Sequence, residues 1–112
     1  MKILVTGGAG YIGSALTYLL IEQGHQVNVI DDLSNGFKEN VNSKANFVNG
    51  SILDELTLNQ GLVGVDAVIH LAAKIRVEEG QIKPELYEKV NIEGTQLLLN
   101  KCKILIIMFQ TN

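Results

Sequence analysis

The stretch that decides the fold is "MKILVTGGAGYIG", residues 1–13. Residues 2–6 form a short segment, mostly apolar and partly β-branched, which predicts a buried strand. Glycines follow this strand without a pause, at Gly7, Gly8, Gly10 and Gly13, where the first helix should begin. A tight turn requires one glycine and not four, so the cluster indicates a place where backbone must come close to another group.

The spacing G-x-x-G-x-x-G between a strand and a helix is typical of a dinucleotide-binding site. The first glycine permits the turn, the second lets backbone approach a pyrophosphate, and the third lets the helix pack close to the strand. Free N–H groups and a partial positive charge at the helix N-terminus then attract the phosphates. The alternative is a tight turn that holds no ligand.

An acidic residue follows the second predicted strand at the distance such a site requires. Asp31 lies 18 positions after Gly13, where a carboxylate accepts hydrogen bonds from the adenosine ribose and repels a 2′-phosphate. No arginine occurs in residues 31–50, which favours NAD over NADP, and Lys38 is the cation nearest in sequence. Asp31 could instead cap a turn, and for Asp32 the ribose and loop interpretations are balanced.

The order of predicted elements indicates an α/β fold. Helical spacing after the glycines predicts a helix that ends at Gly24 and carries one apolar stripe: Ile12, Ala15, Leu16, Leu19 and Leu20. Further strands are predicted at 25–30, 46–50 and 66–73, and helices at 54–62, with Asp54 as N-cap, and from Pro84 to about Lys101. This alternation implies a Rossmann-type parallel sheet with flanking helices. We expect a truncated sheet of about four or five strands, in which "ILIIMF" (104–109) can form a strand by hydrophobicity alone.

Composition narrows the class of protein. The chain has 112 residues, 46% of them apolar and 19% charged, which fits one small globular domain. The net charge is −3 and the acidic residues are scattered, so we expect no nucleic-acid partner. We see no signal peptide, and the run 104–109 is too short to cross a bilayer, so we expect no membrane partner. The single cysteine, Cys102, cannot form an intrachain disulfide, and a cytoplasmic location is expected.

Four segments taken together point to a known family. "VTGGAGYIGSAL", "VIDDLSNG", "DAVIHLAA" and "N-x-x-GT" (Asn91, Gly94 and Thr95) resemble the extended short-chain dehydrogenase/reductase family, in its NAD-dependent epimerase/dehydratase branch. The resemblance covers residues 1 to about 101. It implies NAD as cofactor and a nucleotide sugar as substrate of a full-length relative.

The resemblance also implies where each part of NAD would lie. Tyr11 and Ile12 would lie against the pyrophosphate, residues 31–36 would wrap the adenosine, residues 71–73 would pass under the cofactor, and Asn91 would lie near the nicotinamide. Together with the glycine spacing, this predicts the following cofactor-binding residues: Gly7, Gly10, Tyr11, Ile12, Gly13, Asp31, Asp32, Leu33, Ser34, Asn35, Gly36, Ser51, Ile52, Leu71, Ala72, Ala73 and Asn91. Ser51 stands where the family usually has an aspartate that contacts adenine, so weaker adenine binding is expected.

The chemistry of the family requires parts that these residues do not supply. It uses a Ser or Thr after the fifth strand and a Tyr-x-x-x-Lys pair, but the residues four positions after Tyr11, Tyr18 and Tyr87 are alanine, glutamate and asparagine. We therefore predict no catalytic residue and no metal site, and we take His70 as packed core rather than a ligand. The abrupt end suggests a truncated or frame-shifted product, that is, one incomplete NAD-binding domain over residues 1–112 without a substrate domain.

Three interpretations of function remain at this point. The chain is the NAD-binding portion of a nucleotide-sugar epimerase or dehydratase, inactive by itself, or a non-catalytic NAD-binding module, or an inert fragment. A truncated sheet leaves one edge without a partner, and we expect Leu97, Leu98, Leu99 and the run 104–109 to be exposed there. Self-association or aggregation through that edge is the expected consequence.

Overall fold

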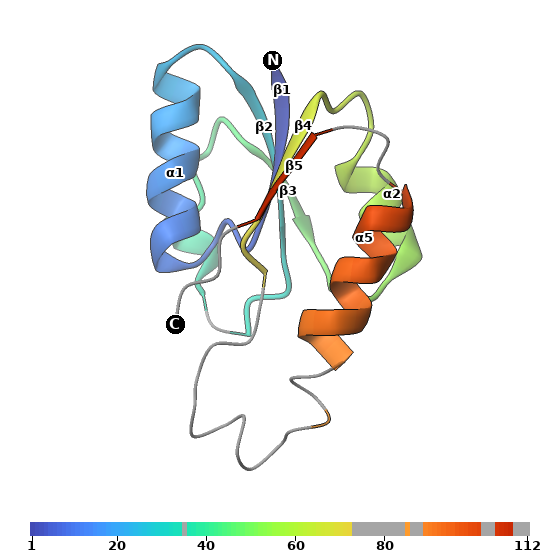
Figure 1. Cartoon of the computed structure of the whole chain (residues 1–112). Helices are drawn as coiled ribbons and strands as arrows, with labels where there is room; N and C mark the ends of the chain where they lie inside the picture. Colours follow the sequence, from blue (N-terminus) through green and yellow to red (C-terminus); the bar gives the residue numbers. More distant parts are fainter. Residues whose placement is uncertain (35, 73–84, 86–88, 102–104, 109–112) are drawn as a thin grey trace.

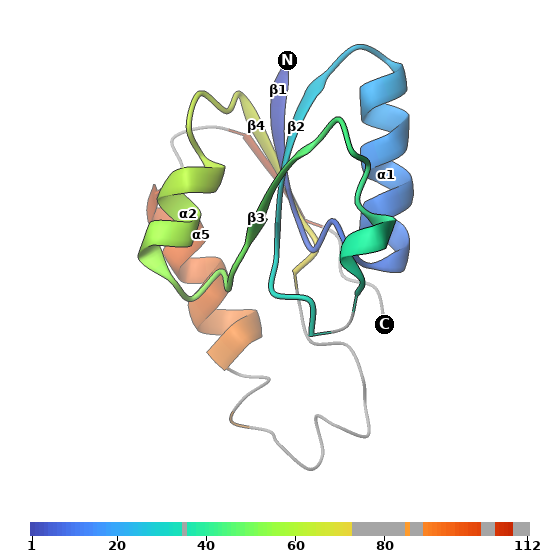
Figure 2. The same cartoon turned by 180° about the vertical axis from the view of Figure 1, so that it is seen from behind.

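The computed structural model describes residues 1–34, 36–72, 85, 89–101 and 105–108. They form a five-stranded sheet in the order β3-β2-β1-β4-β5, and every neighbouring pair is parallel. The strands are β1 (Lys2–Thr6), β2 (Gln26–Asp31), β3 (Asn46–Asn49), β4 (Ala67–His70) and β5 (Leu105–Met108). Helix α1 (Tyr11–Glu22) lies on one face of the sheet, and α2 (Glu55–Gly61) and α5 (Thr95–Lys101) lie on the other (Figures 1 and 2). The predicted Rossmann-type α/β sheet is confirmed.

Strand β1 lies at the centre of the sheet and separates two apolar cores. Ile3 and Val5 point to the α1 face, where they pack with Val27, Val29 and Ile69. Leu4 points to the opposite face and joins a cluster that includes residues of β2, β4, α2 and α5: Ile30, Ile52, Leu58, Val65, Val68 and Leu98. A strand that is covered on both faces must be apolar at consecutive positions, which explains why "KILVT" does not alternate.

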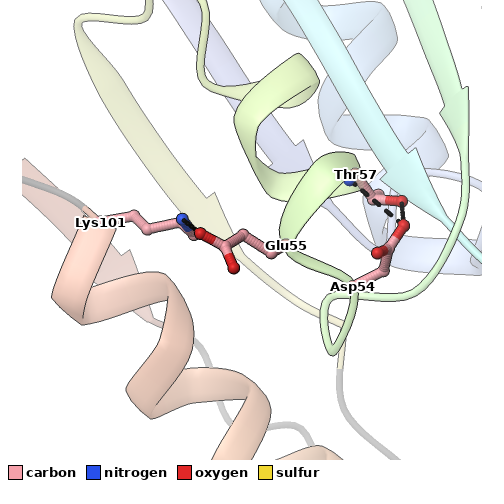
Figure 3. A network of polar contacts seen from close by, with 4 residues as sticks. All are labelled: Asp54, Glu55, Thr57 and Lys101. Carbon is pink, nitrogen blue, oxygen red and sulfur yellow. Dashed lines mark hydrogen bonds and ion pairs between the residues drawn. The ribbon is translucent and has the colours of Figure 1, made fainter.

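Helix α2 begins where the capping chemistry predicts. The Asp54 carboxylate accepts hydrogen bonds from Thr57 N at 3.3 Å and from Thr57 Oγ1 at 2.7 Å (Figure 3). The predicted N-cap is therefore confirmed. On the same side of the molecule, Lys101 Nζ at the end of α5 lies 3.0 Å from Glu55 Oε1 (Figure 3). This exposed ion pair joins the two helices without adding much stability.

The apolar stripe predicted for α1 does not coincide with the side of the helix that the structure buries. Ile12 and Leu19 are 48% and 50% exposed, and Ala15 is exposed as well. The helix instead buries Gly13 and Thr17, while Leu16 and Leu20 pack half-buried on the sheet. Because Gly13 must face the Gly7 backbone, the positions four and seven residues later share its face and define the buried side.

The prediction of an exposed Leu98 is wrong. Its side chain is fully buried against Leu4, Leu58 and Val68, and Leu97 packs half-buried on the same cluster. Helix α5 lies on the face that it shares with α2, so its apolar side is covered by the sheet (Figure 1). The side chains of Leu99 and of residues 104–109 lie outside the description.

Two predicted elements have different bounds. The strand predicted over 66–73 is shorter: Leu71 N still donates to the backbone oxygen of Thr6, but the next amide, Ala72 N, donates to the Thr6 hydroxyl and leaves the ladder. The long helix predicted up to Lys101 contains a π-helical turn, η2 (Lys89–Gly94), before α5, and its predicted start at Pro84 lies outside the described residues. A short 3₁₀ turn, η1 (Lys38–Asn40), takes the place of a helix between β2 and β3.

None of the helices in the described part of the chain has the length and apolar character needed to cross a bilayer.

Candidate functional site

The glycine turn joins the carboxyl ends of three strands. Gly7 has a φ of +77°, a conformation that favours glycine. Its N–H donates to Ile30 O of β2 at 2.7 Å. A Cβ at Gly7 would lie 2.8 Å from the carbonyl carbon of Leu71 and 2.9 Å from the nitrogen of Ala72, just after β4. The first glycine therefore permits close packing of backbone on backbone as well as the turn.

The other two glycines of the motif differ in what surrounds them. A Cβ at Gly13 would collide with the Gly7 carbonyl oxygen and lie 2.8 Å from Gly8 Cα, so any side chain would force α1 away from the turn. A Cβ at Gly10 would meet only Gly7 O, at an ordinary contact distance of 3.4 Å. Within the described residues, contacts with the rest of the protein therefore require a glycine at position 13, whereas position 10 faces space that a ligand can occupy.

The N-terminus of α1 offers amides to this space. Gly10 is the N-cap, has no side chain to cap with, and adopts an extended conformation. The first helical hydrogen bond runs from Ser14 N to Gly10 O at 2.9 Å, so the amides of Tyr11, Ile12 and Gly13 precede it. Tyr11 is 93% exposed. An uncapped helix start with a bare N-cap suits an anion such as a pyrophosphate.

Asp31 connects the glycine turn to the loop after β2. Its carboxylate is buried and accepts hydrogen bonds from Ala9 N at 2.9 Å and from Leu33 N at 2.8 Å. The turn-capping role considered for Asp31 is thus present in the structure. Each carboxylate oxygen has a second lone pair, so the same side chain can still accept a hydroxyl. Asp32 is exposed and accepts from Ser34 N at 2.9 Å, which is again a turn contact.

The loop that follows β2 folds back onto the glycine turn. Ala9 O accepts hydrogen bonds from Phe37 N at 3.3 Å and from Asn40 Nδ2 at 3.5 Å. A Cβ at Gly36 would lie 2.6 Å from the carbonyl carbon of Ala9. Ala9 is therefore the point at which the loop and the turn meet, a role that no sequence pattern indicated. Asn35 lies outside the described residues.

The segment after β3 borders the same edge of the sheet. Gly50 N donates to Asp31 O at 3.1 Å, which places Ser51 beside the end of β2. Ser51 Oγ accepts from Leu53 N at 3.0 Å and keeps its own hydrogen available for another acceptor. The Ile52 side chain is buried in the core, so its contact with a ligand would have to be through backbone.

A buried network of hydrogen bonds holds the segment that follows β4. Thr6 Oγ1 accepts from Leu71 N at 3.0 Å and from Ala72 N at 3.1 Å, and lies 2.6 Å from His70 Nδ1. On the other side of the ring, His70 Nε2 lies 2.9 Å from Thr95 Oγ1 at the start of α5. Burial lowers the pKa of His70 to about 4, so the ring is neutral at pH 7.

His70 is thus a buried residue of the fold, as expected, but the network around it was not predicted. The sequence signal that could have shown it is a polar residue at the end of each of two apolar strands: Thr6 and His70 end neighbouring strands and pair in register. Ala73 lies outside the described residues, and for Asn91 the structure gives only its place in η2. In the described part of the chain, no three His, Cys, Asp or Glu residues gather in a way that could hold a metal ion.

Comparison with known proteins gives a family. Residues 3–108 match the model of the NAD dependent epimerase/dehydratase family. The chain is 43% identical over 101 residues to a UDP-glucose 4-epimerase of Streptomyces lividans, and the match covers 88% of this chain and 31% of that protein.

Solved structures agree with this result. A UDP-glucose 4-epimerase of Thermotoga maritima with UDP-glucose matches with a TM-score of 0.86 and 44% identity, over 90% of this chain and 33% of the other. The UDP-glucose 4-epimerase of Brucella ovis in complex with NAD matches with a TM-score of 0.83 and 42% identity, over 90% and 31%. The chain therefore spans about a third of the length of these relatives.

Proposed function

The chain belongs to the NAD-dependent epimerase/dehydratase family, and from this membership we propose that it binds NAD at the carboxyl edge of its sheet and forms the cofactor portion of a nucleotide-sugar epimerase. The observation that carries the proposal is the geometry at Gly10, where, among the described residues, an uncapped helix start faces open space one residue after Ala9, whose amide donates to the Asp31 carboxylate. Several structural relatives have NAD bound, which supports the same cofactor.

The described residues fit the parts of a dinucleotide. The amides at the start of α1 and the bare Gly10 would hold the pyrophosphate. Asp31 would accept the ribose hydroxyls with the lone pairs that Ala9 and Leu33 leave free. Ser51 and the loop after β2 would border the adenine. NAD, when bound, supplies a hydride acceptor.

Several predicted contacts stay proposals. Leu33, Ser34, Asn35, Gly36 and the backbone of Ile52 are proposed to surround the adenosine. On the nicotinamide side, the proposed contacts are Leu71, Ala72, Ala73 and Asn91. Asp32 has a turn contact in the structure, and a second contact with the ribose is proposed for it as well.

We further propose that these 112 residues alone do not interconvert UDP-glucose and UDP-galactose. No Tyr-x-x-x-Lys pair occurs in them, and they cover only about a third of the relatives that bear the name UDP-glucose 4-epimerase. A second candidate function is an NAD-binding module without turnover. The intact pairing of glycine turn and Asp31 favours such a module over an inert fragment.

Self-association through the sheet is a further proposal. Strand β5 lies at the edge of the sheet and pairs with β4, and in the described residues no strand covers its other side. Such an edge can pair with another chain.

The single cysteine supports a reducing compartment, and the cytoplasm is the proposed location.

Two measurements on the purified 112-residue chain test the proposal. In titration calorimetry, NAD should bind and NADP should bind more weakly, because Asp31 repels a 2′-phosphate. In a coupled assay, UDP-galactose should not be converted to UDP-glucose. Absence of NAD binding by a folded chain would favour the inert fragment, and conversion of the sugar would overturn the proposed inactivity.

A further inference from the structure

Among the residues that the structure describes, the hydroxyl of Thr6 has three polar neighbours, and only one of them can accept its hydrogen. Leu71 N and Ala72 N are backbone amides, which donate and cannot accept. The third neighbour is His70 Nδ1, at the short distance of 2.6 Å. If this nitrogen carried a hydrogen, three donors would converge on Thr6 Oγ1 and its own hydrogen would have no acceptor among them. The Thr6 hydroxyl therefore donates to His70 Nδ1.

The direction of this hydrogen bond determines the tautomer of the ring. An imidazole whose Nδ1 accepts must, when neutral, carry its hydrogen on Nε2. That Nε2–H points to Thr95 Oγ1, 2.9 Å away, and donates to it. One ring with one fixed tautomer thus connects the end of β1 to the start of α5.

Of the two amides that donate to the Thr6 hydroxyl, one depends on it more than the other. Leu71 N has a second acceptor, because it also donates to the backbone oxygen of Thr6 at 3.0 Å. For Ala72 N, the described structure gives Thr6 Oγ1 as its acceptor. The Leu71–Ala72 peptide is also the group on which Gly7 packs, since a Cβ at Gly7 would lie 2.9 Å from Ala72 N. Any rotation of the Thr6 hydroxyl therefore loosens the peptide directly against the glycine turn.

We propose that His70 is a positioning residue of the cofactor site, which acts as the Nε2–H tautomer to orient the Thr6 hydroxyl and thereby holds the Leu71–Ala72 peptide against Gly7. The effect on cofactor binding rests on the proposed function, whereas the tautomer and the fixed amide do not. The neutral form that this role requires agrees with the burial of the ring, which is 5% exposed.

The first test is spectroscopic and uses the unmodified chain without cofactor. In a long-range ¹⁵N–¹H correlation spectrum at pH 7, His70 should show an unprotonated Nδ1 and a protonated Nε2. The opposite tautomer, or a doubly protonated ring, would overturn the proposal whether or not the chain binds NAD.

The second test uses three variants of His70 that separate the two contacts of the ring. His70→Asn keeps an acceptor near the position of Nδ1, His70→Gln keeps a donor near the position of Nε2, and His70→Phe keeps only the bulk. Hydrogen exchange of the Ala72 amide should be about fivefold faster or more in the Gln and Phe variants and near the original rate in the Asn variant. The Leu71 amide serves as internal control and should change less in all three.

The NAD affinity of these variants gives the functional outcome. If the chain binds NAD, the affinity should fall about fivefold or more in the Gln and Phe variants and recover in the Asn variant. Equal loss in all three, at unchanged folding, would show that an acceptor at the position of Nδ1 is not what the site needs, and would overturn the proposal. Affinity retained in the Phe variant would show that His70 acts only through its bulk and would overturn it as well. If the unmodified chain does not bind NAD, the proposed function fails, and the tautomer and the Ala72 exchange rates still decide the role of His70.

Discussion

Replacement of Gly10 by alanine adds one methyl group at the N-cap of α1, in a direction that the protein leaves open. The backbone there has φ −79° and ψ 177°, which alanine adopts without strain. Of the residues that the structure describes, the added carbon would meet only Gly7 O, at 3.4 Å. The folded state should therefore lose only the preference of the N-cap for glycine over alanine, about 1 kcal/mol.

Cofactor binding should suffer more than folding. A methyl group in the space proposed for the pyrophosphate forces the ligand or the turn to shift, and overpacking of this kind costs about 2 kcal/mol. This corresponds to an affinity for NAD that is about thirtyfold weaker. The assay is titration calorimetry with NAD, together with a thermal melt of each variant.

Two further variants separate steric blockage from loss of the cap. Gly10→Ser restores a preferred N-cap residue, so it should melt no lower than the original chain and still lose affinity for NAD. Leu19→Ala removes a half-exposed side chain of the same helix and should leave NAD binding unchanged. A folded Gly10→Ala chain that binds NAD as tightly as the original would refute the assignment of this space to the pyrophosphate.

Three other substitutions test the site and the core. Ser51→Asp should tighten NAD binding about tenfold in calorimetry, because a carboxylate accepts the adenine amino group more strongly than a hydroxyl; unchanged affinity would separate Ser51 from the adenine. Leu98→Ala should lower the free energy of unfolding by about 3 kcal/mol in urea, against about 0.5 kcal/mol or less for the exposed Leu19→Ala; equal losses would contradict the buried position of Leu98. Hydrogen bonds from Thr57 hold the pKa of Asp54 below its usual 3.8, so the ionised carboxylate stabilises α2 above that pH, and the stabilisation is lost as the pH falls through the lowered pKa. Asp54→Ala should therefore melt at a lower temperature than the original chain at pH 7, and the difference between the two melting temperatures should shrink in acid.

Local chemistry was enough to predict the first half of the fold. In β1, the glycine turn and the start of α1, strand propensity, glycine spacing and helical periodicity all indicate the same structure. The cap at Asp54 was predictable for the same reason, since it depends on residues three positions apart. The order of the elements then determined a parallel sheet.

What the sequence missed depends on contacts between distant residues. Helix α1 is apolar on more than one side, and only the contact of Gly13 with the Gly7 backbone decides which side is buried. Leu98 is covered by residues thirty or more positions earlier, such as Val68 and Leu58, so the sequence around it indicates an exposed patch. The tie between Asp31 and Ala9 joins residues 22 positions apart, and that between Thr6 and His70 joins residues 64 positions apart.

The most direct test of the proposed site is to follow the backbone amide resonances of the chain while NAD is added. We predict shifts that cluster at the carboxyl edge of the sheet, in residues 7–13, 31–34 and 51–52 and at Leu71 and Ala72, with the amides at the opposite ends of the strands unchanged. Shifts confined to other surfaces, or no shifts from a folded chain at millimolar NAD, would contradict the proposed site.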